Sequence, residues 1–124
     1  MNSFTIFLLL FLSINCIDES EINCEAIVSS TWPSLNDKLL NSCSCRFYVS
    51  ISDTNVKISN SDSSLHGLSF YKNRDIFYLP VDVAKSFPNL IAYDASETSV
   101  KEIYKDNFRK LRNLRSLSLR RNTI

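Results

Sequence analysis

Four cysteines and a single histidine are the side chains of this sequence best suited to chemistry at neutral pH. Nucleophilic catalysis of the Ser–His–Asp or Cys–His type would need His66 as its base. His66 stands in an alternating run, where a solvent-side strand residue is expected. The chain has no H-x-x-x-H pair and no glycine-rich phosphate loop. We therefore expect no catalytic residues, no enzymatic activity and no cofactor.

The N-terminal segment, residues 1–16, contains an apolar run from Phe4 to Leu12, interrupted by Thr5 alone, and is followed by acidic residues. An apolar run of roughly 7–15 residues at this place is typical of a secretory signal peptide and is too short to span a bilayer. Cleavage after Cys16 would give a secreted, extracellular chain without stable membrane insertion. An uncleaved anchor or a buried N-terminal strand is the alternative.

Loss of the signal peptide would leave Cys24, Cys43 and Cys45 in an oxidising compartment, where one intramolecular disulfide is expected. We favour Cys24 with Cys45, because Cys45 opens the alternating run expected to form the first strand. Cys24 with Cys43 is the alternative pairing. No metal site is expected, since Cys-x-Cys with one distant cysteine and no nearby histidine is poor spacing for tetrahedral zinc.

The charge of the chain is divided unevenly along its length. Residues 1–100 hold 6 basic and 11 acidic side chains, whereas residues 101–124 hold 8 basic and 2 acidic ones. A solvated outer face is the favoured interpretation of the basic end. Its interleaved apolar residues follow a repeat, so neither a nucleic acid nor a membrane surface is an expected partner.

That repeat is the clearest pattern in the sequence. The stretch "LRSLSLRRNTI" has the form L-x-x-L-x-L-x-x-N-x-I, starting at Leu114. A second copy opens 24 residues earlier at Leu90, and a third opens 25 residues before that at Leu65. The connecting segments "IFYLPVDVAKSFPNL" and "VKEIYKDNFRKLRNL" correspond as well. Three copies in phase favour a stacked repeat architecture.

This spacing is the leucine-rich repeat consensus, and the chain resembles secreted leucine-rich repeat proteins of insect type. Such proteins often carry a cysteine-containing cap with a tryptophan before the repeats. The resemblance implies an α/β-type solenoid of short parallel strands with a mostly irregular convex side, preceded by a small disulfide-bearing β cap. It divides the chain into a signal peptide (1–16), a cap (17–63) and about two and a half repeats (64–124).

Strand geometry assigns each repeat position to the core or to solvent. The fourth and sixth positions should point inward, and the ninth should bond neighbouring backbone. The inward pairs are Leu68 and Phe70, Tyr93 and Ala95, and Leu117 and Leu119. The ninth positions are Asn73, Thr98 and Asn122, and the solvent-facing third positions are Gly67, Ala92 and Ser116. In the cap, Phe47, Val49 and Ile51 should share one face of the first strand, with Trp32 packed inside.

Repeat solenoids present their solvent-facing strand positions as one extended concave surface. We therefore expect an extracellular, non-catalytic module that binds a protein ligand. Tyrosine and arginine are enriched in binding hot spots. The candidate ligand-binding residues are Tyr71, Asp94, Ser118, Arg120 and Arg121. The alternative is a truncated structural or regulatory fragment that pairs with another repeat chain, because Ile124 ends the sequence in mid-repeat.

Overall fold

The computed structural model describes residues 21–24, 27–60 and 62–124. The predicted signal peptide, residues 1–16, lies outside these ranges. The described residues form short strands, one α-helix of a single turn and two 3-10 turns. In chain order they are β1 (Glu21–Asn23), β2 (Ile27–Trp32), η1 (Pro33–Leu35), β3 (Lys38–Ser44), β4 (Lys57–Ser59), β5 (Gly67–Ser69), α2 (Val83–Ser86), β6 (Ala92–Asp94), η2 (Lys105–Asn107) and β7 (Ser116–Ser118).

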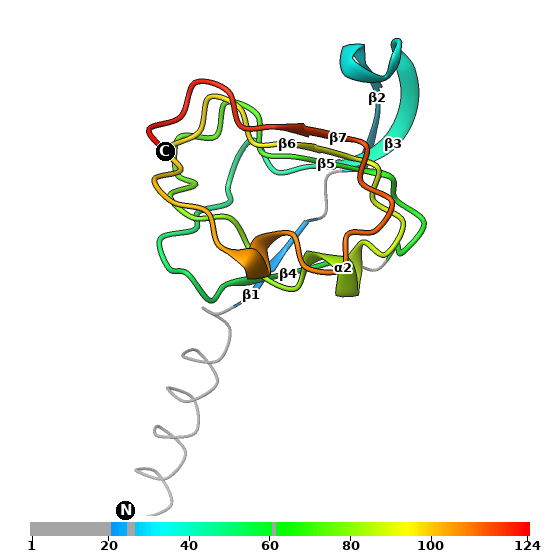
Figure 1. Cartoon of the computed structure of the whole chain (residues 1–124). Coiled ribbons are helices and arrows are strands. Elements are labelled where there is room, and N and C mark those ends of the chain that lie inside the picture. The colour runs from blue at the N-terminus through cyan, green and yellow to red at the C-terminus, as the bar shows by residue number, and fades with distance from the viewer. Residues whose placement is uncertain (1–20, 25–26, 61) are drawn as a thin grey trace, which may run out of the picture.

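The chain coils as a solenoid of about three turns with mostly parallel strands and few helices (Figure 1). One side of the coil is a five-stranded sheet in the order β2-β3-β5-β6-β7. All neighbours in it are parallel except β2, which forms an antiparallel hairpin with β3. The two-stranded β1–β4 sheet and α2 lie on the opposite side of the coil (Figure 1).

The register of the parallel strands confirms the predicted columns. Gly67 is level with Ala92, and Ala92 with Ser116, a step of 25 and then 24 residues. Each short strand therefore sits directly beside its counterpart in the next turn. Leu68 and Tyr93 follow the same register one residue further along.

The core fills the interior of the coil. The predicted inward residues Leu68, Phe70, Tyr93 and Ala95 have no exposed surface, and apolar residues of the returning segments face them. The buried residues of those segments are Ile76, Leu79, Val83, Phe87 and Leu90. In the last turn Leu117 is 43% exposed, since within residues 21–24, 27–60 and 62–124 β7 has a neighbouring strand on one side only. A turn of this coil therefore needs neighbours on both sides to bury its inward column.

The first turn of the coil begins earlier than predicted. β3 pairs in parallel with β5, so that Cys43 is level with Leu68. The first parallel strand is thus Lys38–Ser44, and the expected strand opening at Cys45 is wrong. Phe47, expected on the same buried face as Ile51, is 67% exposed, whereas Ile51 is fully buried.

This early turn has a sequence signal. Leu40, Cys43 and Cys45 have the same L-x-x-L-x-L spacing as Leu65, Leu68 and Phe70. Cysteines occupy positions where the other turns have large apolar residues, so a search for leucines does not find this first copy of the repeat. A buried cysteine packs as a small hydrophobe, so it can occupy a core position of this kind.

The structure pairs Cys24 with Cys43 and leaves Cys45 as a buried free thiol. The favoured prediction, Cys24 with Cys45, is wrong in this structure, and the alternative pairing is present. The prediction of Cys45 depends on a strand that begins at this residue, whereas β3 ends at Ser44, one residue earlier. Cys43 and Cys45 are two residues apart, and both are buried in the same core.

The ninth-position side chains tie successive turns together, as predicted. Asn73 donates from Nδ2 to the carbonyl oxygens of Cys45 and Val49, at 2.7 and 2.9 Å. Asn122 donates to the Ala95 carbonyl at 2.8 Å and accepts a hydrogen bond from Thr98 Oγ1 at 2.6 Å. Each side chain satisfies polar backbone that the turn would otherwise leave buried without a partner.

Candidate functional site

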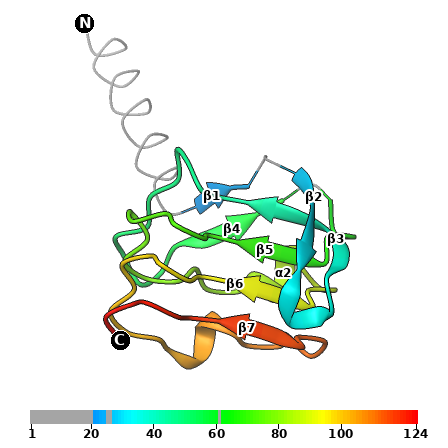
Figure 2. The ribbon, with the colours of Figure 1, turned by 90° about the horizontal axis from the view of Figure 1, so that it is seen from above.

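The β2–β3 hairpin folds over the outer face of the five-stranded sheet. Seen from above, its tip lies across the ends of the parallel strands (Figure 2). The contacts agree with this view: Trp32 packs with Leu40 and Ala92 in a small cluster on that face, and Ser34 hydrogen-bonds Ser116 of β7 through their hydroxyls. Trp32 is buried, as predicted, but on the outer face of the repeat sheet.

This hairpin corrects one prediction for the outer face. The third column was expected to face solvent, yet Gly67 and Ala92 are both buried. A Cβ at Gly67 would lie 2.9 Å from the Ser42 Cβ and 3.0 Å from Cζ2 of Trp32. The first of these contacts is shorter than real Cβ atoms make, and the second is unusually tight. The column is small because the hairpin occupies the space above it.

An open groove lies beside the hairpin tip, where the last two turns are uncovered. Its volume is about 400 Å³. The tip contributes one wall, and the ends of β5, β6 and β7 with the residues after them contribute the floor and the other wall. The lining residues are Trp32, Pro33, Ser34, Tyr71, Asp94, Ser96, Glu97, Ser116, Ser118, Arg120 and Arg121.

All five candidate ligand-binding residues line this groove: Tyr71, Asp94, Ser118, Arg120 and Arg121. The structure brings them together from three successive turns. Sequence reasoning missed the wall made by Trp32, Pro33 and Ser34, because a contact between residues 34 and 116 spans most of the chain. The run of small residues in the third column was the available signal.

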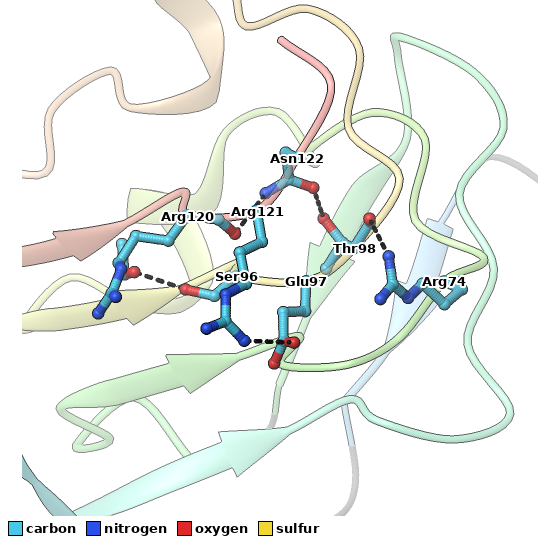
Figure 3. A network of polar contacts seen from close by, with 8 residues as sticks. Arg74, Ser96, Glu97, Thr98, Arg120, Arg121 and Asn122 are labelled. Carbon is cyan, nitrogen blue, oxygen red and sulfur yellow. Dashed lines mark hydrogen bonds and ion pairs between the residues drawn. The ribbon is translucent and has the colours of Figure 1, made fainter.

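An ion pair forms one side of the groove (Figure 3). The Arg121 guanidinium lies 3.1 Å from the Glu97 carboxylate, whose side chain is only 16% exposed. The hydrogen bond from Arg121, followed by one from the Tyr71 hydroxyl, lowers the pKa of Glu97 below its usual value. Tyr71 and Arg121 therefore both approach the same carboxylate.

The floor of the groove is polar and built from small side chains. The Asp94 carboxylate accepts a hydrogen bond from the Ser96 backbone N–H at 2.8 Å, and the hydroxyls of Ser96 and Ser118 bond each other. The Asp94 carboxylate is thereby oriented while remaining partly exposed. Hydroxyl and carboxylate oxygens on such a floor can accept hydrogen bonds from a ligand's N–H groups.

Arg120 is the free cation of the groove. It is exposed, and within the described part of the chain its guanidinium has no ion-pair partner, in contrast to Arg121. A guanidinium presents five donors in a planar fork that matches a carboxylate. Arg120 is therefore available to a ligand, whereas Arg121 already has Glu97.

His66 lies apart from this groove. It is exposed and borders a different hollow, which Lys38, Asn89 and Arg112 also line. In the ranges 21–24, 27–60 and 62–124, no helix has the length and apolar content needed to cross a membrane. No protein-family model, curated protein or solved structure matches the chain.

Proposed function

We propose that this chain is an extracellular recognition module of the leucine-rich repeat type that binds a protein ligand in the groove and performs no catalysis. The observation that carries the proposal is the gathering of Tyr71, Asp94, Ser118, Arg120 and Arg121 around one open groove. The register of β5, β6 and β7 supports the repeat assignment, as do the bonds of Asn73 and Asn122. Secretion rests on the sequence of residues 1–16 alone.

The groove chemistry suits a polypeptide segment. Tyr71, 39% exposed, offers an aromatic ring beside the Glu97 carboxylate. Arg120 offers a fork for an acidic side chain, and Asp94 offers an acceptor for a donor group. The tip of the hairpin forms one wall of the groove and limits its width, which favours an extended segment over a broad, flat surface.

A paired-variant binding experiment tests the proposal. Ligands are selected with the wild-type chain from a displayed library of secreted-protein segments, and their affinities are measured for Tyr71→Ala with Arg120→Ala. Removal of two hot-spot side chains should weaken binding at least about tenfold, which corresponds to about 1.4 kcal/mol. Thermal unfolding should change little, because both side chains are partly or largely exposed.

The chain offers a matched control. Tyr48→Ala with Arg46→Ala removes the same two residue types at exposed positions that do not line the groove. This control should leave affinity unchanged. Ligands that bind both double variants as well as the wild type would contradict a binding role for the groove.

A second function is favoured by the outer edge of the sheet. Among the described residues, β7 has a partner strand on one side only, and Leu117 and Ile124 are 43% and 58% exposed. An apolar strand edge of this kind is a template for pairing. We propose as the alternative that β7 pairs with another repeat chain. Sedimentation of the wild type and Leu117→Lys separates the two: a dimer that the substitution dissociates supports pairing, and a monomer in both contradicts it.

A further inference from the structure

Three cysteine side chains form a single buried cluster next to the first turn. Cys24, Cys43 and Cys45 are all almost completely buried, and their Sγ atoms lie within 4.8 Å of one another. Cys24 is bonded to Cys43, and the Cys45 Sγ lies 2.6 Å from the Cys24 Sγ. The free thiol is therefore in contact with one sulfur of the disulfide.

The backbone holds both partners of Cys24 at the same time. Cys43 belongs to β3, level with Leu68, and the N–H of Cys45 donates to the Ser69 carbonyl at 2.8 Å. Cys24 is fixed by its own N–H, which donates to the Ser59 carbonyl at 3.1 Å. Side chains two residues apart on an extended segment share a face. The sulfur atoms of Cys43 and Cys45 are therefore both held next to the sulfur of Cys24.

We propose that this cluster undergoes internal thiol–disulfide exchange, so that Cys24 alternates between Cys43 and Cys45. The Cys45 thiol loses its proton, and its sulfur attacks the Cys24 Sγ. The Cys24–Cys45 bond forms as the Cys24–Cys43 bond breaks. Cys43 leaves as a thiolate and takes up one proton. Atoms, electrons and protons balance, and no external oxidant or reductant takes part.

The surroundings favour this leaving group and set a slow rate. Asn60 donates a hydrogen bond from Nδ2 to the Cys43 Sγ at 3.5 Å, which stabilises negative charge on that sulfur as it departs. Burial raises the pKa of the Cys45 thiol to about 12, so the attacking thiolate is rare at neutral pH. The buried Tyr93 hydroxyl interacts electrostatically with Cys45, and burial raises its pKa also.

The exchange would change which residue near the base of the β2–β3 hairpin is bonded to Cys24. The tip of this hairpin forms one wall of the groove. Ile27, at the start of β2, is level with Cys43 in the hairpin register. A change from Cys43 to Cys45 shifts the attachment by two residues, about 7 Å along an extended chain. The cluster therefore offers two cross-linked forms of one fold.

Disulfide mapping of the full chain with Cys16→Ser, which removes the fourth cysteine, tests the proposal. The folded protein is held at pH 8 and is then denatured at about pH 4 with excess N-ethylmaleimide, which labels the free thiol. The low pH suppresses further thiol–disulfide exchange during labelling. Trypsin places Cys43 and Cys45 in one peptide, residues 39–46, between Lys38 and the cleavage after Arg46. Tandem mass spectrometry then shows which of the two carries the label.

Both labelled forms are expected, each above about one tenth of the total. Label on Cys45 alone, whatever the time at pH 8, would overturn the proposal. Two further variants, Cys43→Ser and Cys45→Ser, each in the Cys16→Ser background, test whether each pairing can form. Each should form a disulfide between Cys24 and the one remaining cysteine and should have no free thiol. A Cys43→Ser chain that folds but keeps Cys24 and Cys45 reduced would also overturn it.

Discussion

The outer face of the five-stranded sheet has a half covered by the β2–β3 hairpin and a half that is open. Under the hairpin the strand residues are small and buried, as at Gly67 and Ala92. In the open half the residues that follow the strands are larger or charged, as at Tyr71 and Arg120. The same turns of the coil supply both halves. Side-chain size on one face of a strand therefore indicates what packs above it.

Removal of the covering side chain should have the largest effect on stability. Trp32→Ala empties the cluster shared with Leu40 and Ala92, and it deletes the hydrogen bond from the indole N–H to Ser42 Oγ. We expect the free energy of unfolding to fall by about 3 kcal/mol. Urea denaturation measures it, with the fully exposed Tyr48→Ala as control. Equal effects of the two substitutions would contradict a packed hairpin.

The complementary change fills the space under the hairpin. Gly67→Ala introduces a Cβ against Ser42 and Trp32, and we expect a loss of about 2 kcal/mol from overpacking. The double variant Gly67→Ala with Trp32→Ala should lose less stability than the sum of the two single losses, because the two sites are in contact. Denaturation of the two single variants and the double variant gives the coupling. Strict additivity would show that Gly67 is small for another reason.

The inner face under the covered half allows a gain in stability. The Tyr93 hydroxyl is fully buried and has no hydrogen-bond partner among the described residues. Tyr93→Phe removes that polar atom and keeps the ring packing with Phe70 and Phe108. We expect the free energy of unfolding to rise by about 1 kcal/mol. Thermal unfolding checks this, and Tyr48→Phe, at a fully exposed position, is the control. A clear loss of stability would indicate a partner for the hydroxyl.

The smallest expected effect is a pH-dependent change in stability from Glu97, in the open half. The pKa of Glu97 is lowered in the folded chain by Arg121 and Tyr71, so its contribution is present above its ordinary value near 4.5 and is lost as the pH falls through the folded value. Glu97→Gln should therefore be less stable than the wild type at pH 6, and the difference should vanish toward pH 3. Denaturation at several pH values measures it. A difference that is constant with pH would exclude the ion pair as its source.

The repeat columns could be predicted from sequence because spacing alone determines them. Leu68, Tyr93 and Leu117 lie in register as their positions require, and the five candidate residues meet in one groove. The coverage of the outer face could not be predicted, since the expected strand pattern begins only at Cys45 and indicates neither a hairpin over residues 27–44 nor the surface on which it packs. Long-range contacts of this kind leave only an indirect trace, here a small third column.

The first turn and the cysteine pairing were missed for a related reason. A search for leucines overlooks Cys43 and Cys45 in a leucine-like spacing. Once both are core positions of the same turn, the choice between them depends on differences of a few ångströms around Cys24. Such differences are set by packing and are not encoded in sequence spacing.

The bond between Ser34 and Ser116 has a consequence for how the molecule unfolds. In a simple solenoid each turn contacts only its neighbours, so an array can fray one turn at a time from either end. Here the hairpin of the first turn reaches the last described strand, linking residues 82 apart. The bond therefore links the hairpin tip to the strand at the opposite edge of the sheet. We expect unfolding of β7 to disturb the hairpin as well. The backbone amides of all turns should then exchange with solvent in one cooperative step.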